Sequence, residues 1–128
     1  MTVVAGIFLQ DGKVLACRRG SDKSGAGSWE FPGGKVEPGE TPEAALAREI
    51  SEELCIDVNV LELVDRSTTT LKDVTIDLSC YLVEALETEP SSSTDHDLLR
   101  WVPISQLAAL DWAKPDLPTV GALIRSAG

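Results

Sequence analysis

The sequence predicts one α/β or α+β sandwich over residues 1–128, and three observations favour this fold class. Strand-like segments are interleaved with two or three helical ones, which is the pattern of a layered domain. A chain of 128 residues is long enough to bury roughly two-thirds of its unfolded surface around one core. With 43% hydrophobic and 25% charged residues, the composition is that of globular proteins and argues against disorder.

The first predicted elements are two strands joined by a tight turn. Residues 3–9 are apolar, residues 10–13 contain an Asp-Gly turn, and residues 14–18 predict the second strand of a hairpin. The stretch 20–28 is polar and rich in Gly and Ser, so it predicts a loop. Residues 29–31 predict a short strand, which a Pro-Gly-Gly sequence ends.

A helix is predicted over residues 43–54, where strong helix formers predominate. Thr41 is a good N-cap, Pro42 suits the first helical position, and Glu43 favours the positively polarised start of a helix. Apolar side chains that recur every four residues predict the buried stripe: Leu46, Ile50 and Leu54.

The C-terminal half predicts further strands and two helices. Residues 74–83 alternate in polarity and predict a strand, paired with residues 67–71 across a turn at Lys72 and Asp73. The other predicted elements are a strand over 56–64, a polar loop over 87–97, a short strand at 101–102, a short helix over 105–110 capped by Ser105, and a last helix over 118–126.

The charge balance and the cysteines exclude several classes of protein. A formal net charge of −10, without clustered Lys and Arg, argues against binding to polymeric nucleic acid. The apolar run 3–9 is too short to span a membrane, and no basic segment precedes it, so we expect neither a membrane span nor a signal peptide. The three widely spaced cysteines predict reduced thiols and a cytoplasmic protein.

Three glutamates of the predicted helix form the most informative cluster. Glu49, Glu52 and Glu53 stand at i, i+3 and i+4, which places their carboxylates on one helix face. One interpretation is a solvated acidic face, and the other is a site for Mg²⁺ or Mn²⁺, which would relieve the repulsion between these hard oxygen ligands. The preceding Arg48 and the upstream Glu40 favour the metal site.

The same residues resemble the signature of a known family. The Nudix box reads G-x5-E-x7-R-E-U-x-E-E-x-G-U, where U is a bulky aliphatic residue. Here Gly34 is followed after five residues by Glu40, and after seven more by Arg48-Glu49-Ile50-Ser51-Glu52-Glu53-Leu54-Cys55-Ile56. Only Cys55 departs from the pattern, because it stands where the family has glycine.

The resemblance extends to the MutT-type nucleoside triphosphate pyrophosphohydrolases, on residues 29–37, the Arg18-Arg19 pair and residues 99–102. It implies a Nudix-type α/β/α sandwich with a mixed β-sheet and Mg²⁺-dependent hydrolysis of a nucleoside triphosphate to monophosphate and pyrophosphate, with Mn²⁺ as an alternative metal. It further implies nucleotide-pool sanitation linked to DNA repair, with oxidised dGTP or a cytidine triphosphate as substrate. We expect a monomer or a homodimer.

The resemblance also implies a role for each matching residue. The implied metal ligands are the Gly33 carbonyl and four carboxylates, those of Glu49, Glu52, Glu53 and Asp95. Arg48 would hold Glu49 in place, and Gly34 and Glu40 would support the box. The general base that takes a proton from water is one of three acids: Glu52, Glu53 and Asp95. For Asp95 the alternative is a plain loop acid.

Three further positions match residues that bind the nucleotide in this family. Arg19 would contact the phosphates, unless it is a surface charge at a strand end, and Lys35 is a further phosphate candidate. Asp116 lies at the distance after Trp101 where MutT-like enzymes place a base-reading Asn or Asp. Its alternative is an N-cap of the last helix. An ionised Asp only accepts hydrogen bonds, which favours cytosine or guanine types.

Three other residues carry separate expectations. His96, the one histidine of the chain, lies in the polar loop, so we expect it to be solvated and without a catalytic role. Trp112 lies close to Asp116 and could stack on a base, although aromatic side chains more often belong to a core. Cys55 should bear strain of the order of 1 kcal/mol at a helix end where φ is positive.

Two other functions stay open from the sequence. One is hydrolysis of a nucleoside-diphosphate sugar or ADP-ribose, which the short chain and the MutT-like flanks disfavour. The other is a catalytically silent nucleotide- or metal-binding module, which the complete set of glutamates disfavours. Release of pyrophosphate from nucleoside triphosphates distinguishes the three functions.

Overall fold

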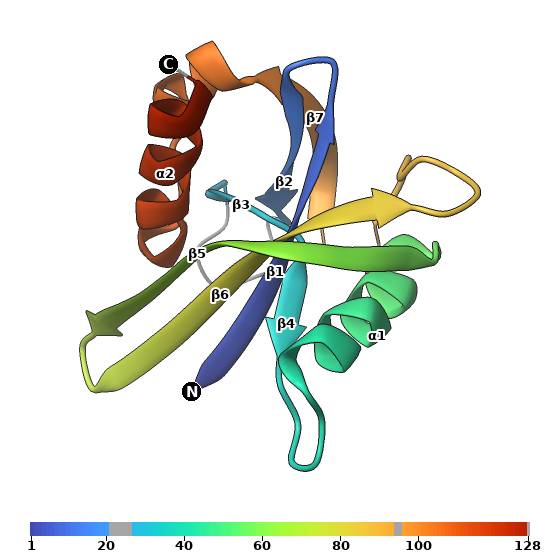
Figure 1. Cartoon of the computed structure of the whole chain (residues 1–128). Coiled ribbons are helices and arrows are strands. Elements are labelled where there is room, and N and C mark those ends of the chain that lie inside the picture. Colours follow the sequence, from blue (N-terminus) through green and yellow to red (C-terminus); the bar gives the residue numbers. More distant parts are fainter. Residues whose placement is uncertain (21–26, 94–95, 128) are drawn as a thin grey trace.

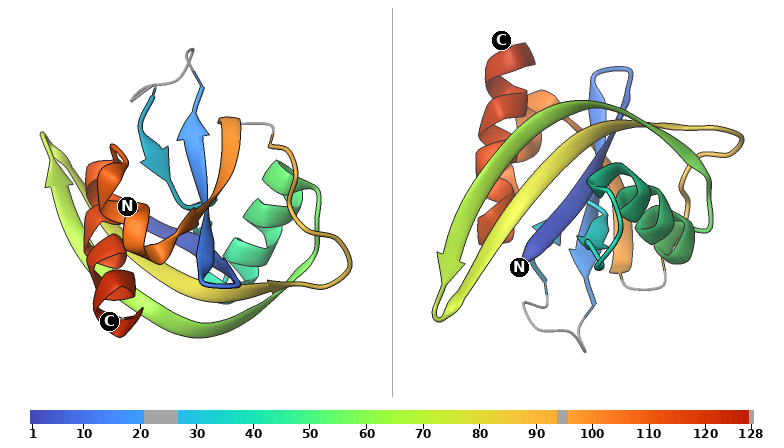
Figure 2. Two further views of the ribbon diagram at one scale, coloured as in Figure 1. Left: turned by 90° about the horizontal axis from the view of Figure 1, so that it is seen from above. Right: turned by 60° about the horizontal axis from the view of Figure 1, so that its bottom comes forward.

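The computed structural model describes residues 1–20, 27–93 and 96–127, which form a seven-stranded mixed sheet with α1 and α2 on opposite sides (Figures 1 and 2). The strands are β1 (Thr2–Gln10), β2 (Lys13–Arg19), β3 (Trp29–Glu30), β4 (Gly33–Lys35), β5 (Val58–Leu71), β6 (Val74–Ala85) and β7 (His96–Pro103). The helices are α1 (Pro42–Leu54) and α2 (Leu117–Ala127), and the 3₁₀ helices are η1 (Ile104–Ala109) and η2 (Lys114–Asp116). The predicted α/β/α sandwich is confirmed.

Strand β1 lies at the centre of the fold, because it joins the two halves of the sheet. It pairs in parallel with β6 and antiparallel with β4, and it forms the predicted hairpin with β2. Since successive side chains of a strand face opposite sides, β1 contributes to two cores. Ala5 and Ile7 pack in the core that includes α2, whereas Val4 and Phe8 pack in the core that includes α1.

Helix α1 forms where the sequence predicts it, with the expected cap. Thr41 Oγ1 accepts a 3.1 Å hydrogen bond from the Ala44 N–H, and Pro42 is the first helical residue. The residues of α1 that belong to its core are Ala45, Leu46, Ile50 and Leu54. This packing decides which side of α1 is turned toward the sheet and which side carries the exposed acids.

Cys55 ends α1 in the left-handed conformation, with φ 57° and ψ 34°, at the position where the Nudix box has glycine. Its N–H donates to the Ser51 carbonyl at 3.1 Å, and the residue is exposed. The helix therefore keeps the end that glycine normally permits, and the expectation of a positive φ is confirmed.

We expect Cys55→Gly to raise the free energy of unfolding by about 0.5–1 kcal/mol, because the Cβ that disfavours this conformation is removed. Thermal denaturation measures the change. Turnover should stay at the wild-type value, since a thiol supplies neither a charge nor a hard oxygen ligand. A collapse of activity in this variant would show that the thiol itself takes part in the reaction.

The structure corrects three predicted boundaries. Residues 58–64 and 67–71 belong to one strand, β5, which begins two residues later than predicted and whose register against β6 shifts twice between Val60 and Asp65, which hides the alternation. Strand β7 begins at His96, inside the predicted loop, because pairing with β2 extends it. Ser105 is not an N-cap, since η1 begins at Ile104 without a side-chain cap. Within the described ranges, no helix is long and apolar enough to cross a membrane.

Candidate active site

Arg48 of α1 holds the acidic cluster together. It donates two hydrogen bonds to the Glu40 carboxylate, from Nε at 2.7 Å and from Nη2 at 2.9 Å. Nη1 lies 2.9 Å from Glu49 Oε1 and 3.4 Å from Glu52 Oε2, and Nη2 also donates to the Lys35 carbonyl at 3.1 Å. The hydrogen bonds from Arg48 are the main reason that the pKa of Glu40 is lowered to about 2. Arg48 thus fastens α1 to the chain segment that precedes it.

At Gly33 and Gly34 of β4, neighbouring atoms lie so close that no residue larger than glycine fits. A Cβ on Gly34 would lie 2.3 Å from Glu49 Cδ, and a Cβ on Gly33 would lie 1.9 Å from the Val4 carbonyl oxygen. The Glu49 carboxylate therefore rests directly against the main chain of β4. The Gly-Gly pair is what brings β4, β1 and α1 this close together.

The other two glutamates of the cluster differ in exposure. The Glu52 side chain is 60% exposed, whereas Glu53 is buried at 7%. Across residues 1–20, 27–93 and 96–127, no three His, Cys, Asp or Glu side chains are arranged to hold a metal ion as they lie. Arg48 accounts for part of this, because it draws Glu49 and Glu52 toward itself. The donor set fits a divalent cation in its chemistry, since Glu49, Glu52 and Glu53 offer hard oxygen ligands from neighbouring positions of α1.

Cys17 of β2 is a buried thiol whose pKa is raised. Burial is the main cause, and the carboxyl groups of Glu53, Glu30 and Asp116 raise the pKa further. These three groups belong to α1, β3 and η2, which are far apart in the sequence.

Asp116 is a buried residue, with 6% exposure, at the end of η2. Its Oδ2 accepts a 2.9 Å hydrogen bond from the Phe31 N–H, which ties η2 to the segment after β3. Burial raises the pKa of Asp116 to about 7; the Phe31 bond and the Arg19 charge oppose the rise, and the Glu30 charge adds to it. The raised pKa favours the protonated carboxyl, which can donate as well as accept a hydrogen bond.

The aromatic residues beside Asp116 belong to the core. Trp112 is 6% exposed, and its Nε1–H donates to the Leu107 carbonyl at 2.7 Å. Its ring centroid lies 4.7 Å from that of Phe31, and Trp29 is 7% exposed. Trp112 therefore packs in the interior, as aromatic residues more often do, and its ring is not presented for stacking on a base.

The two predicted phosphate contacts lie in different surroundings. Arg19, at the end of β2, is half-buried, and its Nη1 lies 3.2 Å from Glu30 Oε1. It is therefore more than a surface charge at a strand end. Lys35 is exposed at the end of β4, beside Arg48, which its main-chain carbonyl contacts. Asp95 lies outside the described residues.

His96 contradicts the expectation of a solvated side chain. Its side chain is 2% exposed, Nε2 lies 2.8 Å from Glu30 Oε2, and Nδ1 lies 2.9 Å from Ser93 Oγ. The cause is the extension of β7, which pairs His96 with Arg19 of β2. Glu30 could have been found from its place in the MutT-like segment 29–37, whereas nothing near His96 in the sequence indicates its partners.

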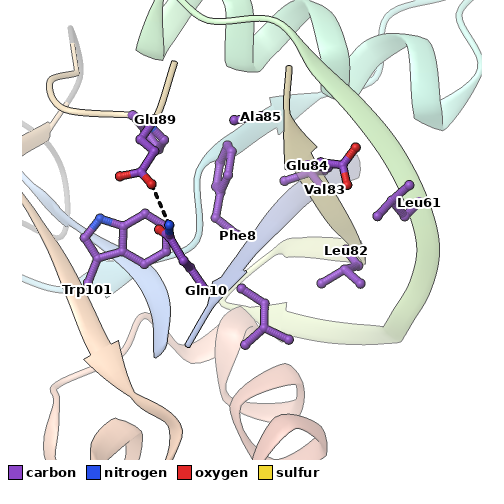
Figure 3. A pocket seen from close by; sticks show the side chains of 11 residues that line it. Phe8, Gln10, Leu61, Leu82, Val83, Glu84, Ala85, Glu89 and Trp101 are labelled. Atoms are coloured by element: carbon purple, nitrogen blue, oxygen red, sulfur yellow. Dashed lines mark hydrogen bonds between the residues drawn. The ribbon is translucent and has the colours of Figure 1, made fainter. Parts of the chain in front are cut away.

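A cavity of about 360 Å³ lies at the ends of β1 and β6, away from these groups (Figure 3). Phe8, Leu82 and Trp101 are among the lining residues, and Gln10 donates a hydrogen bond to Glu89 at its wall. Trp101, a possible base-stacking residue from the sequence, lines this cavity, but none of the predicted metal ligands, phosphate-binding residues or Asp116 does.

The fold and the acidic cluster define a class of protein: an α/β domain that carries a helix of closely spaced carboxylates, held by an arginine, behind a Gly-Gly strand. The NUDIX domain family matches residues 1–123. A "Putative 8-oxo-dGTP diphosphatase 2" of Mycobacterium tuberculosis is 40% identical over 97% of this chain and 88% of that protein. The "CTP pyrophosphohydrolase" of Escherichia coli is 34% identical over 95% of this chain and 90% of that protein.

A solved structure from the same group of proteins has the same fold. The crystal structure of the MutT protein from Methanosarcina mazei Go1, at 21% sequence identity, matches with a TM-score of 0.87 over 99% of this chain and 94% of that chain. The chain belongs to the NUDIX family and is a Nudix hydrolase. Hydrolases of this family generally use divalent metal ions.

Proposed function

We propose that this Nudix hydrolase converts a nucleoside triphosphate and water into a nucleoside monophosphate and pyrophosphate, with residues 1–128 as one domain. The observation that carries the proposal is the acidic cluster of α1, in which Arg48 pairs with Glu40, Glu49 and Glu52 and the Glu49 carboxylate rests against Gly34. Carboxylates of this kind suit a divalent cation, and such a cation suits phosphate chemistry. The names of the Mycobacterium tuberculosis and Escherichia coli relatives support this reaction.

The proposed metal is Mg²⁺, with Mn²⁺ as an alternative. The groups that would hold it are the Gly33 carbonyl and the carboxylates of Glu49, Glu52, Glu53 and Asp95. When bound, the metal supplies positive charge that offsets the phosphate chain and makes water a better nucleophile. Glu49 and Glu52 can turn toward a metal without loosening α1, because Arg48 keeps two hydrogen bonds to Glu40.

The remaining chemistry is assigned to side chains of this chain. One carboxylate takes a proton from the attacking water, and the candidates are Glu52, Glu53 and Asp95. Arg19 and Lys35 bind phosphate oxygens, Arg19 from the buried end of β2 and Lys35 from the exposed end of β4. Both cations compensate part of the charge of the substrate, which an acidic chain otherwise repels.

Asp116 is proposed as the group that reads the base. Ionised, it accepts from the N4 amino group of cytosine or from the paired N–H groups of guanine. Protonated, which its pKa of about 7 allows, it also donates to an acceptor on the base. Cytidine triphosphates and oxidised dGTP are therefore both compatible substrates, and nucleotide-pool sanitation is the proposed role.

The test is a substrate panel with Mg²⁺ that contains the common triphosphates, 8-oxo-dGTP, ADP-ribose and a UDP-sugar. We expect monophosphate and pyrophosphate as products, and a preference of about tenfold or more for one base. Preferred cleavage of ADP-ribose or the UDP-sugar would contradict the proposed substrate class. Nucleotide binding without any product would instead identify a silent module.

A further inference from the structure

Four polar side chains form a continuous line of contacts across β2, β3 and the start of β7. Ser93 Oγ lies 2.9 Å from His96 Nδ1, and His96 Nε2 lies 2.8 Å from Glu30 Oε2. The same carboxylate meets Arg19 Nη1, at 3.2 Å from Oε1 and 3.4 Å from Oε2. Glu30 is thus shared between the buried imidazole and a guanidinium that is proposed to bind phosphate.

The hydrogen-bond roles along this line are mutually consistent. A carboxylate of Glu30 only accepts, so His96 Nε2 carries a hydrogen and donates it. In a neutral ring Nδ1 then accepts from the Ser93 hydroxyl. These hydrogen bonds matter because the His96 side chain is 2% exposed, and a buried polar group without a partner destabilises the folded state.

An irregularity in β7 aims His96 at Glu30. Arg18 pairs with Leu98 while Arg19 pairs with His96, so Asp97 is an extra residue on β7. Bulges of this kind redirect side chains and are frequent next to active sites. Asp97 is turned to Arg18, whose Nε donates to it at 2.9 Å. The regular pairing of β2 with β7 is therefore interrupted where His96 lies opposite Arg19.

We propose that His96 is a positioning residue, which keeps the Arg19 guanidinium ready for the phosphates of the substrate. The inference rests on the proposed function and on the role of Arg19 in it. His96 and Arg19 share Glu30 Oε2: His96 Nε2 lies 2.8 Å from it, whereas Arg19 Nη1 lies 3.4 Å from it and 3.2 Å from Oε1. Longer hydrogen bonds are weaker, so Arg19 can exchange them for a phosphate.

Without His96, no imidazole N–H competes for Glu30 Oε2, on which Arg19 Nη1 has its longer contact. The guanidinium and the carboxylate can then close to two short parallel hydrogen bonds, the strongest arrangement for this pair. Arg19 would be held by Glu30 in competition with the substrate. The expected defect is in nucleotide binding and not in the chemical step.

The test compares the wild-type chain with His96→Leu and His96→Gln, on the triphosphate that the panel shows to be hydrolysed best. We expect His96→Leu to raise KM about tenfold and to leave kcat within about twofold of wild type. His96→Gln retains an amide donor for Glu30 and should restore most of the wild-type KM. An unchanged KM in His96→Leu, or a loss confined to kcat, overturns the proposal.

Leu123→Ala serves as the control for lost stability, because Leu123 is a core residue of α2 outside the line of contacts. Its melting temperature should fall while its KM stays at the wild-type value. A rise in KM equal to that of His96→Leu would overturn the proposal, since lost stability alone would then explain both variants.

A second measurement separates this proposal from the proposed function. The side-chain N–H signals of Arg19 are recorded by NMR in the nucleotide-free chain. His96→Leu should shift them, and His96→Gln should leave them near their wild-type positions. If the wild type hydrolyses no triphosphate, the proposed function fails, and the Arg19 signals still test the contact. Unshifted signals in His96→Leu overturn the positioning role.

Discussion

Glu53→Gln is expected to lower turnover at least about a hundredfold while folding stays near normal, because the change keeps the shape and removes one charge from the metal site. Glu53 is the buried member of the three glutamates on α1, and its charge acts on the Cys17 thiol between α1 and β2. Pyrophosphate release at saturating substrate measures the effect, and circular dichroism measures the fold. Wild-type turnover in this variant would contradict the metal mechanism.

Two controls accompany that variant. Glu43→Gln makes the same change at an exposed position of the same helix and should keep nearly all of the activity. EDTA should abolish turnover of the wild type, and Ca²⁺ should bind and inhibit, because it prefers more ligands and longer bonds than Mg²⁺. Full activity in EDTA would exclude the proposed use of a metal.

Asp116→Ala is expected to lower kcat/KM for the preferred nucleotide by about 1–3 kcal/mol, which is the usual loss for a specificity contact. Poor substrates should lose much less, and metal affinity should not change. Because Ala also leaves the buried Phe31 N–H without its acceptor, Asp116→Asn is the matched variant that keeps an oxygen there. If every nucleotide slows equally in both variants, the base is read elsewhere.

The raised pKa of Asp116 also predicts how stability depends on pH. The folded chain holds the Asp116 proton up to about pH 7, whereas an aspartate exposed to water loses its proton near pH 3.8. The protonated carboxyl therefore makes its full stabilising contribution below pH 3.8. That contribution falls by about 1.4 kcal/mol per pH unit as the pH rises from 3.8 to the folded pKa of about 7. Asp116→Asn should match the wild type in acid and exceed its stability at pH 8, by chemical denaturation. Equal pH profiles would contradict the shift.

The parts of the fold that depend on neighbours in the sequence could be predicted. Thr41, Pro42 and the four-residue spacing of Leu46, Ile50 and Leu54 specify α1, because a helix is stabilised by contacts within a few residues. The spacing of Gly34, Glu40 and Arg48 likewise places the acids of the box, since the Glu40–Arg48 contact spans one loop and two helical turns.

The parts that depend on distant pairing could not be predicted. The sequence around Asp116 indicates a helix cap, but its Oδ2 accepts a hydrogen bond from the Phe31 N–H, on a segment far back in the chain. The polar sequence around His96 indicates a loop, but pairing with β2 extends β7 to His96 and buries its ring against Glu30. In both cases a polar side chain takes a partner that only the assembled sheet supplies.

The parallel pairing of β1 with β6 also sets an order of assembly. During synthesis β1 leaves the ribosome before β6, which follows only after α1 and β5. Until then β1 can form its hairpin with β2 and its pairing with β4, while its long-range partner is still missing. Because such non-local pairing closes a long loop, it slows folding and leaves apolar surface exposed in the nascent chain. The central strand is therefore among the earliest segments to be made and among the last to be completed.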